Sequence, residues 1–379
     1  MSQLRIPAVY MRGGTSKGVF FHTTDLPDDA DLRDKILLRV IGSPDPYRKH
    51  TDGMGGATSS TSKVVLISKS ARPDCDVDYS FGAVSIENPV IDWSGNCGNL
   101  TSGVGPFAIS EGLVTAPHDG FAVVRIWQVN IQKRIVAHVQ MAAGEVIEDG
   151  SFELDGVTFP AAEIRLEFLD LQGSAMFPTG HKREWLDVPG EGTLDVTLIN
   201  AGNPTIFIDA KALGLTGTEL QSDINSQAEL LARAEAIRAH AAVAMGMAST
   251  PEDATLNRPH TPKLAFVSRS AAYTASSGKA IQAEHIELVV RIFSMGQLHH
   301  AMTGTGAVAI AVAAVIPGTL VNGLLGGHQP DMIRFGHPSG TLLVGAEAEF
   351  IDGEWVVKKA IMSRTARRLM EGFVRIPKV

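Results

Sequence analysis

The chain has 379 residues, of which 44% are hydrophobic and 20% are charged. This composition is typical of a folded globular protein and excludes an intrinsically disordered one, and the length predicts two domains. The formal net charge of −8 argues against nucleic acid and acidic membrane surfaces as partners. Residues 1–10 lack the pattern of a signal peptide, and the longest apolar run, residues 307–316, is too short to span a bilayer.

Cys75 and Cys97 are the two cysteines of the chain, and neither belongs to a CxxC pair. The sequence therefore argues against a disulfide framework and a cysteine zinc site, and it predicts a protein of the reducing cytoplasm. Cys75 lies between Asp74 and Asp76, whose negative charges disfavour the thiolate. We therefore expect Cys75 to have no catalytic role.

The first predicted strands span residues 5–10 and 18–22, and a polar turn at residues 11–17 joins them. Gly13 and Gly14 allow a tight turn, while Ser16 and Lys17 supply hydrogen-bond donors to a ligand above it. The alternative is a solvated hairpin with two cations.

Residues 31–41 have apolar side chains at helical spacing and predict a helix. The Gly-, Ser- and Thr-rich loop at residues 51–63 precedes an apolar strand at residues 64–68. Such a loop either surrounds a small polar ligand or is flexible. Lys63 lies at the start of the strand, where partial burial favours a neutral amine that can act as a base. The alternative is a solvated lysine.

Residues 76–81 and 83–87 predict a pair of strands, and residues 90–93 form another apolar run. The sequence SGNCGNLTSGVGPF at residues 94–107 follows, and an apolar segment continues to about residue 113. A helix that begins here presents unpaired N–H groups that attract carboxylates or phosphates. Cys97 lies at that helix start, which favours its thiolate, unless it is simply a buried, inert cysteine.

Strands are predicted at residues 122–128, 133–141 and 163–168, and turn-rich segments follow at residues 175–180 and 188–192. We place the domain boundary there, which gives domains at residues 1–187 and 188–379. About the last 15 residues are expected to return to the first domain. In the second domain we expect strands at residues 194–200, 205–209, 264–267 and 286–293. A long structural helix is predicted from a cap at Ser226 to about Met245, with Gly246 after it.

The segment HHAMTGTGA at residues 299–307 begins an Ala- and Val-rich helix that runs to about residue 316. Each half of the chain thus has a strand, a Gly-rich polar turn and an apolar helix, with Cys97 and Thr303 separated by 303 − 97 = 206 positions. An internal duplication predicts two helix N-termini directed to one cleft between the domains, suited to a molecule with two or three carboxylates. His299 and His300 lack metal-ligand spacing and are interpreted as structural residues or as one substrate contact.

Nine segments together resemble the PrpF family over about residues 6–377. They are MRGGTSKGVFF, VIGSPDPY, DGMGGATSSTSKV, SGNCGNLTSGVGPFAI, AMFPTG, INAGNPTIF, LHHAMTGTGAVA, RFGHPSGTL and AIMSRTARRLMEGFV. The resemblance implies a diaminopimelate epimerase-like fold, in which two similar α/β domains each have a curled, mostly antiparallel sheet around a central helix. It also implies a cofactor-independent isomerase, and the family includes the 2-methylaconitate cis–trans isomerase of the methylcitrate cycle of propionate catabolism.

Epimerases of this fold use two facing cysteines, and Cys97 matches the first of them. The second position falls at Thr303, so two-thiol racemisation is in doubt, and the resemblance assigns proton transfer to Lys63. Cys97 then either protonates the intermediate or only hydrogen-bonds to it. The candidates for holding substrate carboxylates are Ser16, Lys17, Ser60, Asn96, Gly98, Asn99, Lys279, Thr303, Gly304 and Thr305. No metal, nucleotide or flavin is expected.

Other functions stay open at this point. Sister isomerases of the family act on 4-oxalomesaconate or 3-methylitaconate. A different class is a non-catalytic accessory protein of an iron–sulfur methylcitrate dehydratase, although two cysteines are few for handling a cluster. A carboxylate-binding module is a third class. The expected ligand is a small tricarboxylate, and a homo-oligomeric state is left open.

Overall fold

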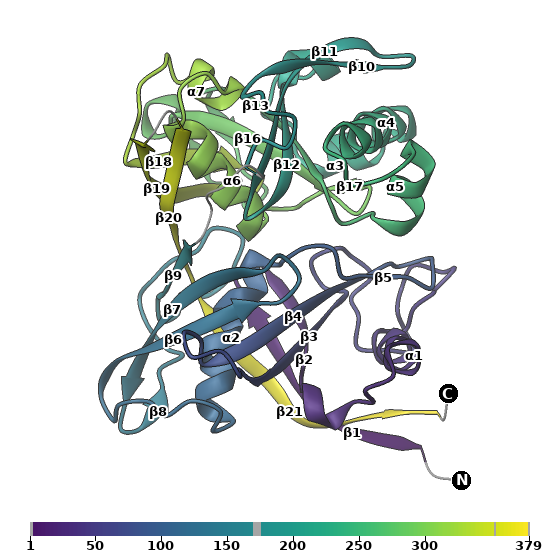
Figure 1. The fold of residues 1–379 in the computed structure, drawn as a ribbon, viewed down its shortest axis with the longest axis vertical. Coiled ribbons are helices and arrows are strands. Elements are labelled where there is room, and N and C mark those ends of the chain that lie inside the picture. Colours follow the sequence, from purple (N-terminus) through teal and green to yellow (C-terminus); the bar gives the residue numbers. More distant parts are fainter. Residues whose placement is uncertain (1–2, 170–175, 352–353, 378–379) are drawn as a thin grey trace. The chain divides into compact units, whose positions relative to one another are not determined.

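The computed structural model describes residues 3–169, 176–351 and 354–377. The chain divides into two compact units, which are coloured by sequence in Figure 1. The first unit comprises Met1–Glu153, Phe159–Leu166 and Arg364–Val379, and the second comprises Leu154–Thr158 and Glu167–Ser363. None of the helices in the described ranges is long and apolar enough to cross a membrane.

The first unit is a mostly antiparallel sheet with two α-helices. Its strands are β1 (Leu4–Gly13), β2 (Ser16–His22), β3 (Lys63–Lys69), β4 (Val77–Val84), β5 (Ile91–Asp92), β6 (Gly120–Gln128), β7 (Lys133–Ala142), β8 (Glu145–Val146), the start of β9 (Ile164–Leu169) and β21 (Ala366–Ile376). The helices are α1 (Ala30–Ile41) and α2 (Gly98–Ser110). Strand β1 pairs antiparallel with both β2 and β21, and β3 lies parallel to β2.

Helix α2 is the centre of the first unit. Its residues 98–108 are all buried, and the helix contacts β1, β2, β6, β7 and β21. A helix that is apolar on every side is stable only when other elements surround it. The apolar segment after Cys97 therefore forms the helix around which this sheet curls (Figure 1).

The second unit contains more helices. Its strands are β10 (Glu184–Val188), β11 (Gly192–Ala201), β12 (Asn203–Asp209), β13 (Lys263–Arg269), β14 (Tyr273–Thr274), β15 (Ala280–Ile281), β16 (Leu288–Ser294), β17 (Gln297–Leu298), β18 (Met332–His337), β19 (Gly340–Ile351) and β20 (Glu354–Arg364). Its helices are α3 (Gln221–Asn225), α4 (Ala228–Ala244), α5 (Pro251–Asn257), α6 (Gly304–Val315) and α7 (Leu320–Leu324). Every residue of α6 is buried, so α6 has the same role here as α2 in the first unit.

The two units repeat one strand register. Lys63 and Lys263 are the first residues of β3 and β13, and these strands lie parallel to β2 and β12. Within these parallel pairs, Ser16 has the same register position relative to Lys63 as Asn203 has relative to Lys263. Each of the two residues is the first one after the turn of its hairpin. The predicted duplication, with one central helix in each half, is therefore confirmed.

Two local predictions were wrong. Residues 83–87 do not form a separate strand, because β4 continues to Val84 and then pairs with the short β5. Helix α4 has Gln227 rather than Ser226 at its N-terminal cap, and no side chain caps it. The rest of the α4 prediction is confirmed, since its apolar face is buried and Gly246 follows in a left-handed conformation.

Candidate active site

Lys63 of the first unit is buried against two other candidate site residues. Its Nζ donates to Ser16 Oγ at 2.9 Å and lies 3.1 Å from Cys97 Sγ. The Lys63 side chain is 6% exposed, and its Nζ is 5.7 Å from the centre of the Phe81 ring. Within the described residues no carboxylate contacts this amine. The predicted pair of a buried lysine and a thiol at a helix start is therefore present in one unit.

Cys97 is the N-terminal cap of α2. Its Sγ accepts a hydrogen bond from Leu100 N at 3.4 Å, and its carbonyl accepts from the Tyr79 hydroxyl at 3.4 Å. Burial raises the pKa of Tyr79 well above its ordinary value, so this group stays a neutral donor. The N–H of Gly98 donates to no acceptor in the described ranges. This helix start therefore offers a donor and the positive end of the helix dipole to an anion.

Asn99 fixes the first turn of α2. Its Oδ1 accepts from Arg364 Nε at 2.9 Å, and its Nδ2 donates to Thr15 Oγ1 at 3.0 Å. Burial lowers the pKa of Arg364 to about 10, so the guanidinium is still a cation at neutral pH. Asn96 is also buried, and its Oδ1 accepts from Thr101 Oγ1 at 3.3 Å. Asn96 and Asn99 thus hold the helix start in place, and Arg364 is a residue that the sequence patterns missed.

The Ser- and Thr-rich loop is anchored to the hairpin and to itself. Lys17 N donates to Ser60 O at 3.0 Å, and Ser60 Oγ lies 3.0 Å from Thr58 Oγ1. The Lys17 Nζ lies 5.4 Å from the centre of the Tyr10 ring. Ser60 is buried, and its hydrogen bond with Lys17 places it beside the hairpin that carries Ser16.

His50 holds the base of this loop and was also missed by the sequence patterns. It is buried, and its Nδ1 accepts from Ala57 N at 3.2 Å and lies 3.2 Å from Ser62 Oγ. Because Nδ1 accepts the Ala57 hydrogen bond, the neutral ring with its proton on Nε2 fits this geometry. Burial lowers the pKa of His50, while a hydrogen bond with the Ile86 backbone and the charge of Asp45 oppose that shift only in part.

We expect acid to loosen this loop. The pKa of His50 is lower in the folded protein than in the unfolded chain, so the unfolded chain takes up the proton first, near the ordinary pKa of about 6.5. The stability that this histidine contributes is therefore present above about pH 6.5 and is lost as the pH falls further. Thermal unfolding between pH 7.5 and 5.5 measures the effect, and H50Q, which cannot titrate, should show a smaller fall. An equal fall in both proteins would contradict this role.

The helix start of the second unit has Thr303 where the first has Cys97. Thr303 Oγ1 accepts from Gly306 N at 3.1 Å, and the N–H groups of Gly304 and Thr305 have no acceptor among the described residues. His299 and His300 precede it with their rings stacked 4.7 Å apart, and His299 Nδ1 accepts from Ala301 N at 3.1 Å. The bond from Ala301 orients the His299 ring. The two N–H groups form a second set of donors suited to an anion.

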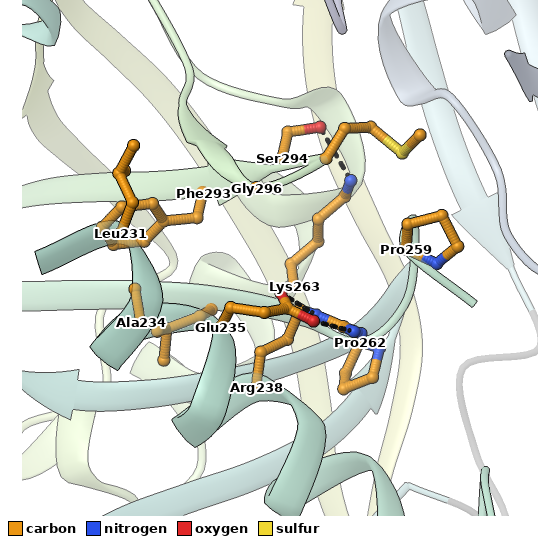
Figure 2. A pocket seen from close by; sticks show the side chains of 12 residues that line it. Leu231, Ala234, Glu235, Arg238, Pro259, Pro262, Lys263, Phe293, Ser294 and Gly296 are labelled. Carbon is orange, nitrogen blue, oxygen red and sulfur yellow. Dashed lines mark hydrogen bonds and ion pairs between the residues drawn. The ribbon is translucent and has the colours of Figure 1, made fainter. Parts of the chain in front are cut away.

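Lys263 is the counterpart of Lys63 in the second unit, and Figure 2 shows its side chain reaching Ser294. Its Nζ donates to Ser294 Oγ at 2.8 Å and lies 3.1 Å from His260 Nδ1. The hollow beside it, drawn in Figure 2, has a volume of about 10 Å³, which is room for about one water molecule. This hollow is too small for an organic acid.

Lys279 belongs to the second unit and forms an ion pair there. It lies in the turn of the β14–β15 hairpin, and its half-exposed Nζ pairs with Asp155 Oδ1 at 3.1 Å. Its contacts within the described chain are with Asp155 and its own hairpin. A carboxylate of the protein therefore already neutralises this cation.

The larger hollows of the first unit lie at the other end of α2. They measure about 780 and 450 Å³ and share Ser110, Arg368 and Glu371 in their linings. Arg368 pairs with Glu111 at 2.7 Å, and Glu111 also lies 3.2 Å from His22 Nε2. These surroundings are largely acidic and lack a buried nucleophile or base, so Lys63 and Cys97 are the stronger candidates. Nowhere in the described ranges do three or more His, Cys, Asp or Glu side chains form a potential metal site.

This chain is similar to known proteins over nearly its whole length. The family model described as "PrpF protein" matches residues 3–377. The chain belongs to the PrpF family. It is 61% identical over 388 residues to the PrpF relative named 2-methyl-aconitate isomerase of Cupriavidus necator, covering 99% of this chain and 98% of that protein. It is 59% identical over 389 residues to the protein of the same name from Shewanella oneidensis, with the same coverage.

Solved structures support the fold. The crystal structure of methylitaconate-delta-isomerase superposes with a TM-score of 0.77 at 41% identity, covering 100% of this PrpF chain and 97% of that one. A hydroxyproline epimerase from Agrobacterium vitis superposes with a TM-score of 0.55 at 11% identity, over 98% of this chain and 93% of its own. The expected diaminopimelate epimerase-like fold is therefore confirmed.

Proposed function

We propose that this protein is a cofactor-independent 2-methylaconitate cis–trans isomerase in which Lys63 moves the proton. One observation carries the proposal: a buried lysine amine lies beside the thiol that caps the central helix. Identity of 61% and 59% to two proteins named for this activity supports the choice of substrate.

The chemistry begins at an acidic methylene. In 2-methylaconitate a CH₂ group lies between a carboxylate and a conjugated double bond, so loss of its proton leaves a delocalised dienolate. Neutral Lys63 removes this proton, while Ser16 Oγ accepts a hydrogen bond from the amine and fixes its direction. The C=C bond about which the cis and trans isomers differ then has single-bond character, so rotation about it becomes possible. Return of the proton from Lys63 completes the exchange.

The charge of the dienolate develops on carboxylate oxygens. The N–H of Gly98 and the positive end of α2 stabilise this charge without reorganisation, because the helix is rigid and buried. Asn99 keeps that helix start in position through Arg364 and Thr15. Cys97 either hydrogen-bonds to the intermediate or donates a proton to it. The further carboxylate-binding candidates are Lys17, Ser60, Asn96, Lys279, Thr303, Gly304 and Thr305. Lys279 is the weakest of them because its amine already pairs with the Asp155 carboxylate.

Substrate choice is tested by steady-state rates on three acids. We expect kcat/KM to be highest for 2-methylaconitate, by roughly tenfold or more over 3-methylitaconate and 4-oxalomesaconate. The reason is that a substrate pocket discriminates by about this factor between molecules that differ by one small group. A higher value for either of the other acids would reassign the protein to a sister isomerase. Binding of all three acids without turnover would instead indicate a carboxylate-binding module.

The methylcitrate cycle of propionate catabolism is the proposed setting, and a cytoplasmic location agrees with the free thiols of Cys75 and Cys97. In this setting an iron–sulfur methylcitrate dehydratase is the enzyme that shares the substrate. If the purified protein bound that dehydratase but isomerised no aconitate, an accessory role would replace the enzymatic one.

A further inference from the structure

The contact between Lys63 and Cys97 has a second chemical consequence. The two reactive atoms are 3.1 Å apart, and both side chains are at least nine-tenths buried. Cys97 Sγ also accepts from Leu100 N, and the start of α2 places partial positive charge beside the sulfur. A thiolate is the form of cysteine that hydroperoxides oxidise.

We propose that Lys63 and Cys97 form an oxidative modification site, in which a hydroperoxide converts the pair into a reversible sulfur–nitrogen cross-link. In the first step the thiolate attacks the peroxide, its O–O bond breaks, and sulfenic acid and hydroxide are formed. In the second step the neutral Lys63 amine attacks the sulfur, the S–O bond breaks, and water leaves with a proton from the amine. Two electrons pass from the thiol to the peroxide, and no other reactant is needed.

The geometry selects this product over the usual oxidation ladder. A sulfenic acid that meets a second nucleophile condenses with it, and one that does not is oxidised further to sulfinic acid. Here the amine is already in contact with the sulfur, and Ser16 Oγ holds it there. Cys75 offers a contrast, because burial and Asp74 raise the pKa of its thiol and the neighbouring cation is Arg72 rather than an amine.

The cross-link has a functional effect that rests on the proposed function. It turns the Lys63 amine into a weakly basic nitrogen that is bonded to sulfur, so the base is blocked while the bond persists. Reduction by a dithiol regenerates both side chains. The enzyme would therefore lose activity under peroxide and recover it on reduction.

Peptide mass spectrometry of the full-length protein after hydrogen peroxide treatment tests the cross-link directly. The peptides that carry Lys63 and Cys97 should appear joined, about 2 Da lighter than the sum of their reduced forms, and should separate after dithiothreitol. The variant C75S should keep the cross-link, while C97S should lose it. In K63M the thiol should instead advance to sulfinic acid, about 32 Da heavier.

Wild-type protein that yields only sulfinic or sulfonic acid on Cys97, or no change there, would overturn the proposal. So would joined peptides about 14 Da heavier than the reduced pair, because an oxygen atom would then lie between nitrogen and sulfur. The mass measurement needs no substrate, so its result tests the cross-link even if the isomerase assignment is wrong. With 2-methylaconitate as substrate, the peroxide-treated enzyme should lose at least about tenfold in rate and regain it with dithiothreitol.

Discussion

Replacing Lys63 with methionine is expected to reduce isomerisation of 2-methylaconitate by roughly 10²–10⁴-fold, the usual contribution of a positioned general base. Methionine keeps much of the buried apolar stem but removes the amine that contacts Ser16 and Cys97. The measurement is NMR in deuterated water, which follows isomerisation and deuterium incorporation together. Both should disappear in K63M, because one proton transfer is responsible for both.

Lys69 provides a matched control on the same strand. It is the last residue of β3, and its side chain is exposed, so K69M changes the same residue type without touching the site. We expect wild-type rates and exchange for this variant. Undiminished deuterium exchange in K63M would remove Lys63 as the base and leave Cys97 as the proton-transfer group to test.

A methyl group at Gly13 is expected to damage both the fold and the site. A Cβ on this residue would lie 2.7 Å from Asn99 O and 2.9 Å from Leu100 Cα, which are backbone atoms of the first turn of α2. The helix start must therefore shift, at a cost of about 1–3 kcal/mol in the free energy of unfolding. Because the Gly98 N–H and Cys97 move with that turn, kcat should fall by up to roughly 10²-fold.

Thermal unfolding and kcat of G13A test this expectation, and G323A serves as the control. Gly323 lies in the short helix α7, where a Cβ meets only the flexible end of Arg183 at 3.4 Å. This variant should have nearly wild-type stability and activity. If G13A were as stable and active as G323A, the close packing of β1 against α2 would not be required for stability or activity, and the expectation would be wrong.

Local patterns predicted the chemical pair of the site. Lys63 follows a polar loop and is the first residue of an apolar strand, and Cys97 stands between an apolar strand and an apolar helix. Strand and helix starts are set by nearby residues, so sequence is a good guide to them. Arg364 could not be found in this way, because it lies 265 positions from its partner Asn99. Only the folded register of the last strands brings them together.

Lys279 shows what a local pattern leaves out. Its charge and polar turn suggested a contact with a substrate carboxylate, which stays a prediction, and the pattern gave no sign that Asp155 pairs with it from a distant part of the chain. Lys263, in contrast, was detectable: KVVLISK at Lys63–Lys69 and KLAFVSR at Lys263–Arg269 share a lysine, four apolar residues, a serine and a cation. Comparing the two halves strand by strand, rather than helix by helix, would have revealed it.

The pairing of β21 with β1 also determines when the first unit can be finished. Translation produces β1 first and β21 last, yet the two strands pair from Leu4↔Ile376 to Gly13↔Ala366. Asn99 therefore receives Arg364, and β1 receives its partner strand, only after the segment from Arg364 to Ile376 has been synthesised. The second unit, which ends at Ser363, is synthesised in full before that point. A polypeptide that stops before Arg364 thus contains every segment of the second unit but lacks the β21 strand and the arginine that holds Asn99.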